Sequence, residues 1–278
     1  MSCDMKFDYQ EALKRQNSNE SDIFELREKI RKHSHVPTKL SNKKLLCFLH
    51  ACNGVDDAAK VISTYYEVRQ ACPAVFSNRD PLSNEVQQCL ENQYYFHMPN
   101  TPSGYSVIYH CLSNNKASNY IFDEACKTFF MTLDSLLCTQ GPSNGLIIVF
   151  DMKNVGYRHL LRPTIDGLRT FFHYLQDALP ARLESMHIMN CGPVFNLVLA
   201  MIKPFMRSEI IQKMHLHPCG IDYQKFHKEH IPSSCLPSDF EGQLDSIIEL
   251  HKNHCAMLAR LREYFIADEK EANENKSI

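Results

Sequence analysis

The sequence predicts an α/β protein in which a small helical bundle precedes a mostly parallel sheet flanked by helices. Two observations predict this class. Short segments with helical spacing of apolar residues fill the N-terminal part, and apolar strand-like runs then alternate with amphipathic helices. With 278 residues, the chain is long enough to bury a core that encloses an apolar cavity.

Four parts are expected along the chain. Helical patterns follow a polar opening, and the turn residues Asn78-Arg79-Asp80-Pro81 mark the boundary at which strand patterns begin. A last amphipathic helix leads into a charged tail. The expected parts are a flexible N-terminus (1–20), a helical bundle (21–78), an α/β domain (85–243), and a C-terminal helix with a disordered tail (244–278).

The bundle has recognisable helix ends. Ser21 or Asp22 is expected to be the N-cap of a first helix, and Ser41 of a second. Gly54 ends the second helix, and a third continues until Pro73. Short helices with short connections predict an antiparallel bundle.

The α/β part alternates strands and helices. Residues 146–150 are apolar throughout, which is typical of a strand covered on both faces. The alternation predicts a mostly parallel sheet. The other expected strands are 94–96, 106–112 and 185–190, and the expected helices are 122–138, 164–179, 194–206 and 245–265.

The composition favours a soluble, cytoplasmic protein that binds no nucleic acid. The net charge is -2, whereas nucleic-acid binding usually shows as a basic face and a high pI. The 12 cysteines include no CxxC pair and indicate reduced thiols. The N-terminus has no apolar signal core, and no run reaches the roughly 18–20 apolar residues that span a bilayer.

The sequence contains one match to a serine-hydrolase motif. Residues 141–145 match G-x-S-x-G, in which Ser143 would be the nucleophile. That mechanism needs the serine after a strand and before a helix, whereas here a helix precedes it and a strand follows. Asp151, at the end of a strand, is better explained as the cap of the turn at Asn154 than as a catalytic carboxylate. We expect no catalytic residue.

Metal and nucleotide sites are not expected either. His215, His217 and Cys219 lie close together, as do His227 and His230, but neither group has the HExxH spacing of a zinc helix. With 14 histidines, such groups arise by chance. The chain has no glycine-rich phosphate loop, so no cofactor is expected.

The segment 194–202 is apolar on almost every side and is followed by Pro204. Such a helix is either buried or faces lipid, and this one is too short to span a membrane. Two interpretations remain open from the pattern alone. The segment is a core helix between layers, or it is a gate that closes over a cavity and lies in a membrane interface when open.

Several segments together resemble the CRAL-TRIO (Sec14-like) lipid-transfer family, and most of all its tocopherol-transfer and retinaldehyde-binding branch. The helix Leu45-Leu46-Cys47-Phe48-Leu49-His50-Ala51-Cys52 resembles the family's N-terminal signature. The block from Ile147 through Met201-Ile202-Lys203-Pro204-Phe205-Met206 to Cys235-Leu236-Pro237 is similar in order and spacing over residues 25–265.

The resemblance implies a lipid pocket, a mobile gate helix and a headgroup site. Thr128, Thr132 and Tyr174 would be the few polar groups able to orient a ligand hydroxyl. The implied pocket residues are Ala125, Thr128, Thr132, Leu146, Ile148, Phe150, Phe171, Tyr174, Leu175, Leu179 and Met186. The implied gate residues are Phe195, Val198, Leu199, Ile202, Phe205 and Met206, and the headgroup residues are Arg182 and Lys213.

The chain departs from the family at several of these places. Cys52, Glu184 and Glu209 stand where positive charge would be expected, so we expect weakened phosphoinositide binding. The closing Gly-Gly of the family is Glu241-Gly242 here. Tyr174 is larger than the usual residue, which favours a ligand other than tocopherol itself.

The functional expectation is a monomeric, non-catalytic carrier of a tocopherol-, retinoid- or terpenoid-like molecule. Its partners would be that hydrophobic ligand and, transiently, a membrane surface. The alternative is a lipid-responsive regulatory module with a phosphoinositide or phospholipid ligand, from which membranes would not accelerate ligand release. An esterase that uses Ser143 is the third and weakest hypothesis.

Overall fold

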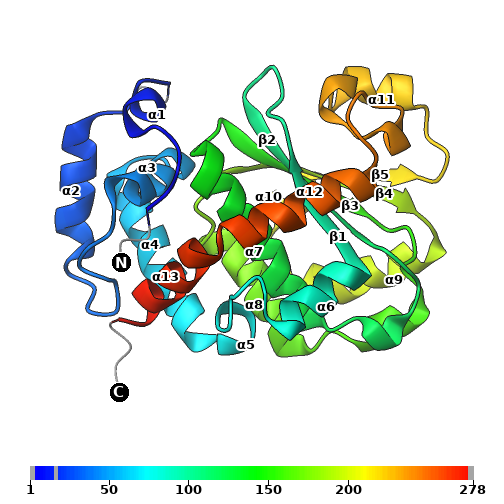
Figure 1. Ribbon diagram of the computed structural model, residues 1–278, viewed down its shortest axis with the longest axis horizontal. Coiled ribbons are helices and arrows are strands. Elements are labelled where there is room, and N and C mark those ends of the chain that lie inside the picture. The colour runs from blue at the N-terminus through cyan, green and yellow to red at the C-terminus, as the bar shows by residue number, and fades with distance from the viewer. Residues whose placement is uncertain (1–3, 16–17, 275–278) are drawn as a thin grey trace.

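The N-terminal part of the chain is helical in the computed structural model, which describes residues 4–15 and 18–274 (Figure 1). Helices α2, α3 and α4 pack against one another as the predicted bundle. The first six helices are α1 (Tyr9–Arg15), α2 (Glu20–Ile30), α3 (Asn42–Ala51), α4 (Val55–Ala71), α5 (Pro73–Phe76) and α6 (Asn84–Asn92).

The ends of these helices follow their capping residues. The Ser41 hydroxyl accepts a hydrogen bond from the Lys44 amide at 3.2 Å, which confirms the predicted cap of α3. Gly54 is the N-cap of α4 and has φ 108°, a conformation that residues with a Cβ rarely adopt. The predicted cap at Ser21 or Asp22 was wrong, because α2 already begins at Glu20 and Asn19 is its N-cap.

Helices occur within two segments that were expected to be flexible or disordered. Helix α1 lies in the segment expected to be flexible, and Met5, Phe7 and Ala12 there are buried. At the other end, the expected single helix is divided at Leu261 into α12 (Ile247–Arg260) and α13 (Arg262–Asn273). Most of the tail expected to be disordered is therefore helical, and only residues 275–278 of it lie outside the described chain.

A five-stranded sheet forms the centre of the α/β part, in the order β1-β2-β3-β4-β5. Strands β1 and β2 form an antiparallel hairpin, and all other neighbours are parallel, as predicted. Strand β5 was not among the expected strands. The strands are β1 (Gln93–Met98), β2 (Tyr105–Leu112), β3 (Gly145–Asp151), β4 (Leu183–Cys191) and β5 (Met214–Pro218).

Helices cover both faces of this sheet, as the apolar run of β3 predicted. Leu146 and Ile148 face the core shared with the bundle, α7 (Phe122–Gln140) and α8 (Ile165–Asp177). Ile147 and Val149 face a second core with α11 (Tyr223–Glu229) and the segment that follows it. A strand between two apolar layers has no polar face, which explains its continuous apolar sequence.

The apolar helix expected over residues 194–206 ends earlier than predicted. Helix α9 (Pro193–Ile202) stops before Pro204, and a 3₁₀ turn, η3 (Lys203–Phe205), continues the chain. Proline lacks an N–H and therefore cannot continue the α-helical hydrogen bonding. Helix α10 (Ser208–Gln212) then leads into β5.

The turn at Glu241-Gly242 is kept despite the departure from the family pattern. Glu241 adopts the left-handed conformation with φ 53°. A Cβ on Gly242 would lie 2.0 Å from the Leu236 carbonyl oxygen, so glycine is required at that position.

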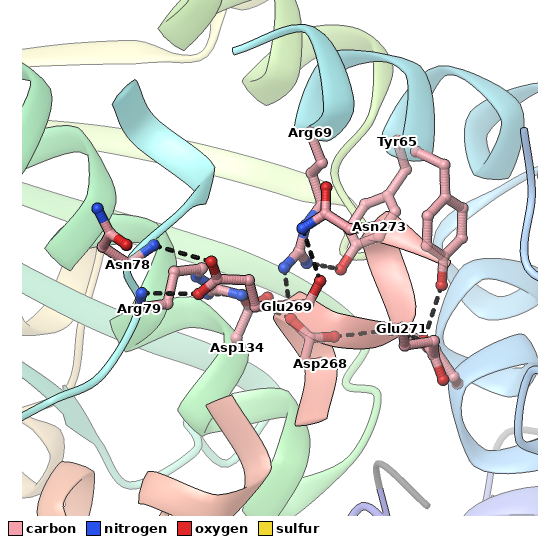
Figure 2. Close-up of polar contacts among 11 residues, drawn as sticks. Tyr65, Arg69, Asn78, Arg79, Asp134, Asp268, Glu269, Glu271 and Asn273 are labelled. Carbon is pink, nitrogen blue, oxygen red and sulfur yellow. Dashed lines mark hydrogen bonds and ion pairs between the residues drawn. The ribbon is translucent and has the colours of Figure 1, made fainter. Parts of the chain in front are cut away.

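A buried ion network fastens α13 to the rest of the molecule (Figure 2). The Asp268 carboxylate accepts hydrogen bonds from Arg69, Arg79 and Lys44, which come from α4, the segment after α5, and α3. Burial acts to raise the pKa of Asp268, but the three cations outweigh it and leave that pKa below its usual value. These contacts tie α13 to α3, to α4 and to the segment after α5.

The network has two further acids. Arg79 also donates to Asp134 of α7, and Lys44 donates to Glu271 at 2.6 Å. Three cations therefore face three carboxylates, so the charges balance within the interior. Buried charges are tolerated only when they are paired in this way.

Candidate functional site

A largely apolar cavity of about 200 Å³ lies between the sheet, α7, α8 and α9. Its wall includes the aromatic rings of Phe129, Phe150 and Phe171, which come from three different elements. The Phe129 ring lies 5.4 Å from that of Phe150 and 5.6 Å from that of Phe171. The remaining apolar wall residues include Leu112, Phe122, Met152, Leu168, Phe172 and Ile188.

Helix α9 closes one side of this cavity, and we call it the lid helix. Phe195, Val198, Met201 and Ile202 of the lid helix line the cavity. The opposite side faces outward and is also largely apolar, and Leu197 there is 49% exposed. One face of the lid helix thus packs inward and the other meets solvent.

The C-terminal end of the lid helix is tied to α8. The Gln176 side chain donates to the Phe205 carbonyl at 3.0 Å and accepts from the Arg207 amide at 2.7 Å. The Arg207 guanidinium donates to Asp177 at 2.6 Å. These bonds fasten the segment after the lid helix. The N-cap at the other end is Gly192, which has no side chain to bond to the first turn.

The residues that line the cavity include five with polar side chains: Tyr95, His110, Tyr120, Asp151 and His159. Asp151 is already occupied, because it accepts from Tyr109, Asn190 and the Lys153 amide. Its role as a turn and strand cap, predicted from the sequence, is therefore what the structure shows.

The structure brings part of the implied site together. Ala125, Phe150 and Phe171 line the cavity from α7, β3 and α8. Phe195, Val198 and Ile202 line it from the lid helix. The cavity wall does not include the other residues implied by the resemblance. These are Thr128, Thr132, Leu146, Ile148, Tyr174, Leu175, Leu179, Met186, Leu199, Phe205 and Met206.

The two threonines and the tyrosine face other parts of the molecule. Thr132 lies 3.1 Å from His254 of α12, and Thr128 is fully buried. The Tyr174 ring packs at 4.5 Å from Phe130 and 4.7 Å from Phe76, against the bundle. None of the three is a lining residue, so they do not contact a ligand in this cavity.

Sequence reasoning missed the polar residues that do reach the cavity. His110 is the strand neighbour of Phe150, which was expected in the pocket. Because adjacent parallel strands place paired residues on the same face, this pairing is the signal that points to His110. Tyr120 and His159 lie in a loop and a 3₁₀ turn, η2 (Tyr157–Leu161), where periodicity gives no such signal.

The serine of the G-x-S-x-G match is engaged within its own turn. The Ser143 hydroxyl donates to the Gly145 carbonyl at 2.9 Å, as expected for a turn between a helix and a strand. Within residues 4–15 and 18–274 no group of three or more histidine, cysteine or acidic side chains is arranged to hold a metal ion. All cysteines in the same part of the chain are free.

Comparison with known proteins identifies the family of this chain. A family model described as "CRAL/TRIO domain" matches residues 90–242. The chain belongs to the CRAL/TRIO family. A second model, "Pinta-like, UBA domain", matches residues 15–86, which include the helical bundle. CRAL/TRIO relatives are lipid-binding and transfer proteins.

Two curated CRAL/TRIO relatives are similar over much of the chain. "Alpha-tocopherol transfer protein-like" of Homo sapiens is 29% identical over 227 residues, which cover 80% of this chain and 64% of the relative. "Clavesin-1" of Xenopus laevis is 26% identical over 197 residues, which cover 68% and 56%. The chain thus spans less than two thirds of the length of these relatives.

A solved structure, that of Sfh5, also matches this CRAL/TRIO chain. Its TM-score is 0.44 at 12% identity, and the match covers 81% of this chain and 85% of that one. Among the described residues, no helix is both long and apolar enough to traverse a bilayer.

The two basic residues implied for a headgroup site have partners within the protein. Arg182 donates to Asn53 at 3.2 Å, next to Cys52, and thereby joins the sheet to the bundle. The Lys213 ammonium donates to the Leu183 carbonyl. Glu184 and Glu209 are exposed, so they add negative charge on the surface of β4 and α10.

Proposed function

We propose that this chain is a non-catalytic carrier that encloses one tocopherol-, retinoid- or terpenoid-like molecule and exchanges it at membrane surfaces. The observation that supports this most is the lid helix, which is apolar toward the cavity and apolar toward solvent. A helix that only completed a core would present polar residues outward. The proposal places the protein in the cytoplasm, as a monomer that meets membranes transiently.

The cavity suits an apolar ligand. Burial of about 400 Å² of apolar ligand surface contributes roughly 10 kcal/mol before the costs of association. The uncommitted polar groups at the wall are few, which is typical of sites that bind an apolar body and orient it by one or two hydrogen bonds.

Loading requires the lid to move. The cavity of about 200 Å³ is smaller than the roughly 300–1,000 Å³ of ordinary small-molecule pockets. A terpenoid therefore fits only if the lid helix or the aromatic wall shifts outward. Because the Gln176 and Arg207 bonds hold the C-terminal end of the lid helix, we expect its N-terminal end near Gly192 to move outward.

Exposed apolar side chains next to the lid support membrane contact. Tyr157, Leu161 and Ile165 are exposed by 61%, 84% and 66%, and η2, which contains the first two, contacts the lid helix. We group these three residues with Leu197 of the lid helix and call the set the apolar rim. Clustered apolar side chains on a protein surface mark contact sites for lipid or protein.

Weakened phosphoinositide binding remains part of the proposal. Arg182 donates a hydrogen bond to the Asn53 side-chain oxygen, and Lys213 donates one to the Leu183 carbonyl. Glu184 and Glu209 would repel a phosphate. Strong, salt-sensitive binding to vesicles with phosphatidylinositol bisphosphate would contradict this part alone.

Transfer between vesicles tests the proposal. Donor vesicles carry a fluorescent retinoid or tocopherol analogue, and acceptor vesicles carry a quencher. A carrier that unloads on contact shows a transfer rate that rises with acceptor concentration. A rate that does not depend on acceptor vesicles would contradict exchange at membranes and favour the lipid-responsive regulatory module.

A further inference from the structure

The hydrogen-bonding state of the cavity's polar groups restricts the chemistry of a ligand. The Asp151 carboxylate accepts three hydrogen bonds from the protein, one of them from Tyr109, which belongs to the core on the other face of the sheet. The Tyr95 hydroxyl donates to Gln93 Oε1 at 2.7 Å. His110, His159 and Tyr120 are the remaining polar groups at the wall.

The tautomer of His110 is set by Gln93. His110 Nε2 lies 2.9 Å from Gln93 Oε1, and a carbonyl oxygen can only accept. Nε2 therefore carries the proton, and Nδ1 presents a lone pair. Burial lowers the pKa of His110 to about 3, so the ring stays neutral at pH 7. Nδ1 has no hydrogen-bond partner among the described residues.

His159 is held in the same Nε2–H tautomer, but by a hydrogen bond at its other ring nitrogen. Its Nδ1 accepts a hydrogen bond from the Gly156 amide at 3.0 Å, so Nε2 carries the proton and is a donor. The Tyr120 ring lies 5.7 Å from that of His159 and offers a hydroxyl that can donate or accept. The wall therefore has a fixed acceptor on β2 and donors on the side of η2.

We propose that the cavity selects ligands with a free hydroxyl group, which donates its proton to Nδ1 of His110. This inference rests on the proposed function and names its ligand class as alcohols and phenols. An ether, ester or hydrocarbon of the same skeleton has no proton to donate, so it would leave Nδ1 buried without a partner. The oxygen of an aldehyde only accepts hydrogen bonds, so it would be repelled by the lone pair on Nδ1 of His110.

Matched ligand pairs test this inference. The probes are retinol with retinyl methyl ether and α-tocopherol with its methyl ether, measured by competition against a bound fluorescent fatty alcohol. We expect the wild-type protein to bind each alcohol about tenfold more tightly than its ether, the usual size of such an effect. The His110→Leu variant is expected to bind both members of a pair equally.

A second variant separates loss of the acceptor from loss of structure. His110→Asn keeps an acceptor oxygen near the position of Nδ1 and is expected to keep the preference for alcohols. Thermal unfolding of both variants checks that they fold. Equal binding of alcohol and ether by the wild type, or an unchanged preference in His110→Leu, would overturn the inference while leaving the carrier intact. Failure of every probe to bind would overturn the carrier itself.

Discussion

Asp268 Oδ2 lies 2.6 Å from Arg79 Nη1, although 189 positions separate the two residues in the chain. This pair joins the last helix to the segment between the bundle and the sheet (Figure 2). Both side chains are fully buried. The C-terminal helix is thus part of the core that supports the cavity, even though its sequence is polar and charged.

Asp268→Asn is expected to destabilise the protein by about 3–5 kcal/mol, because it leaves three buried cations short of a charge partner. Urea unfolding measures this free energy. The matched control is Asp80→Asn, which breaks the exposed pair with Arg262 and is expected to cost less than about 1 kcal/mol. Equal effects of the two substitutions would contradict the role given to the network.

Stability is expected to fall on acidification below about pH 6.5, because buried histidines stay neutral in the folded protein. Burial lowers the pKa of His97 to about 4 and of His187 to about 3, with His230 adding to the effect at His187. Below the ordinary pKa of about 6.5 the unfolded chain binds protons that the folded chain does not. Each such histidine then costs about 1 kcal/mol at pH 5.5.

Urea unfolding at pH 7.5 and pH 5.5 checks this pH dependence. His97→Gln is expected to reduce the loss between the two pH values by about 1 kcal/mol. His173→Gln, at an exposed histidine of α8, is the control and is expected to leave the loss unchanged. A stability that is flat between the two pH values would refute this account of the histidines.

Much of the fold was predictable from local pattern. The apolar run of β3 and the helical periodicity of α7 and α8 are set by burial on one or two faces, and such patterns are readable in sequence. The order of the C-terminal tail was not, because Asp268 and Glu271 look like solvent-exposed charges until their partners Lys44, Arg69 and Arg79 are known. Ion pairs between residues far apart in the chain leave no signal in the local sequence pattern.

The site was predictable only in part, for a related reason. Phe171 and Tyr174 are three residues apart on α8 and were both expected in the pocket. Helix α8 lies between the cavity and the bundle, so Phe171 lines the cavity and Tyr174 packs against Phe76. Spacing identifies apolar positions, but it does not say which of two neighbouring cores each one enters.

Filling the cavity is expected to abolish ligand binding. Ala125→Trp adds a large side chain at the wall and is expected to weaken binding at least tenfold, with an overpacking cost of about 1–3 kcal/mol in stability. Ala200→Trp, on the exposed side of the lid helix, is the control and should bind as the wild type does. Ligand titration followed by native mass spectrometry measures both. Normal binding by Ala125→Trp would place the ligand elsewhere.

The apolar rim is expected to govern unloading and not affinity. Leu161→Glu puts a charge on its most exposed side chain and is expected to slow transfer to vesicles several-fold, while ligand affinity in solution stays the same. Phe24→Glu is the control, because Phe24 is 67% exposed on α2, outside the rim. A similar transfer rate for Leu161→Glu and the wild type would exclude the rim from membrane contact.

Native mass spectrometry of the purified full chain, followed by organic extraction, tests the central claim most directly. The account predicts one apolar molecule per chain, released intact on denaturation, and an alcohol or phenol among the extracted compounds. A chain that carries no such molecule, and takes up no retinoid, tocopherol or phospholipid when these are added, would contradict the carrier function.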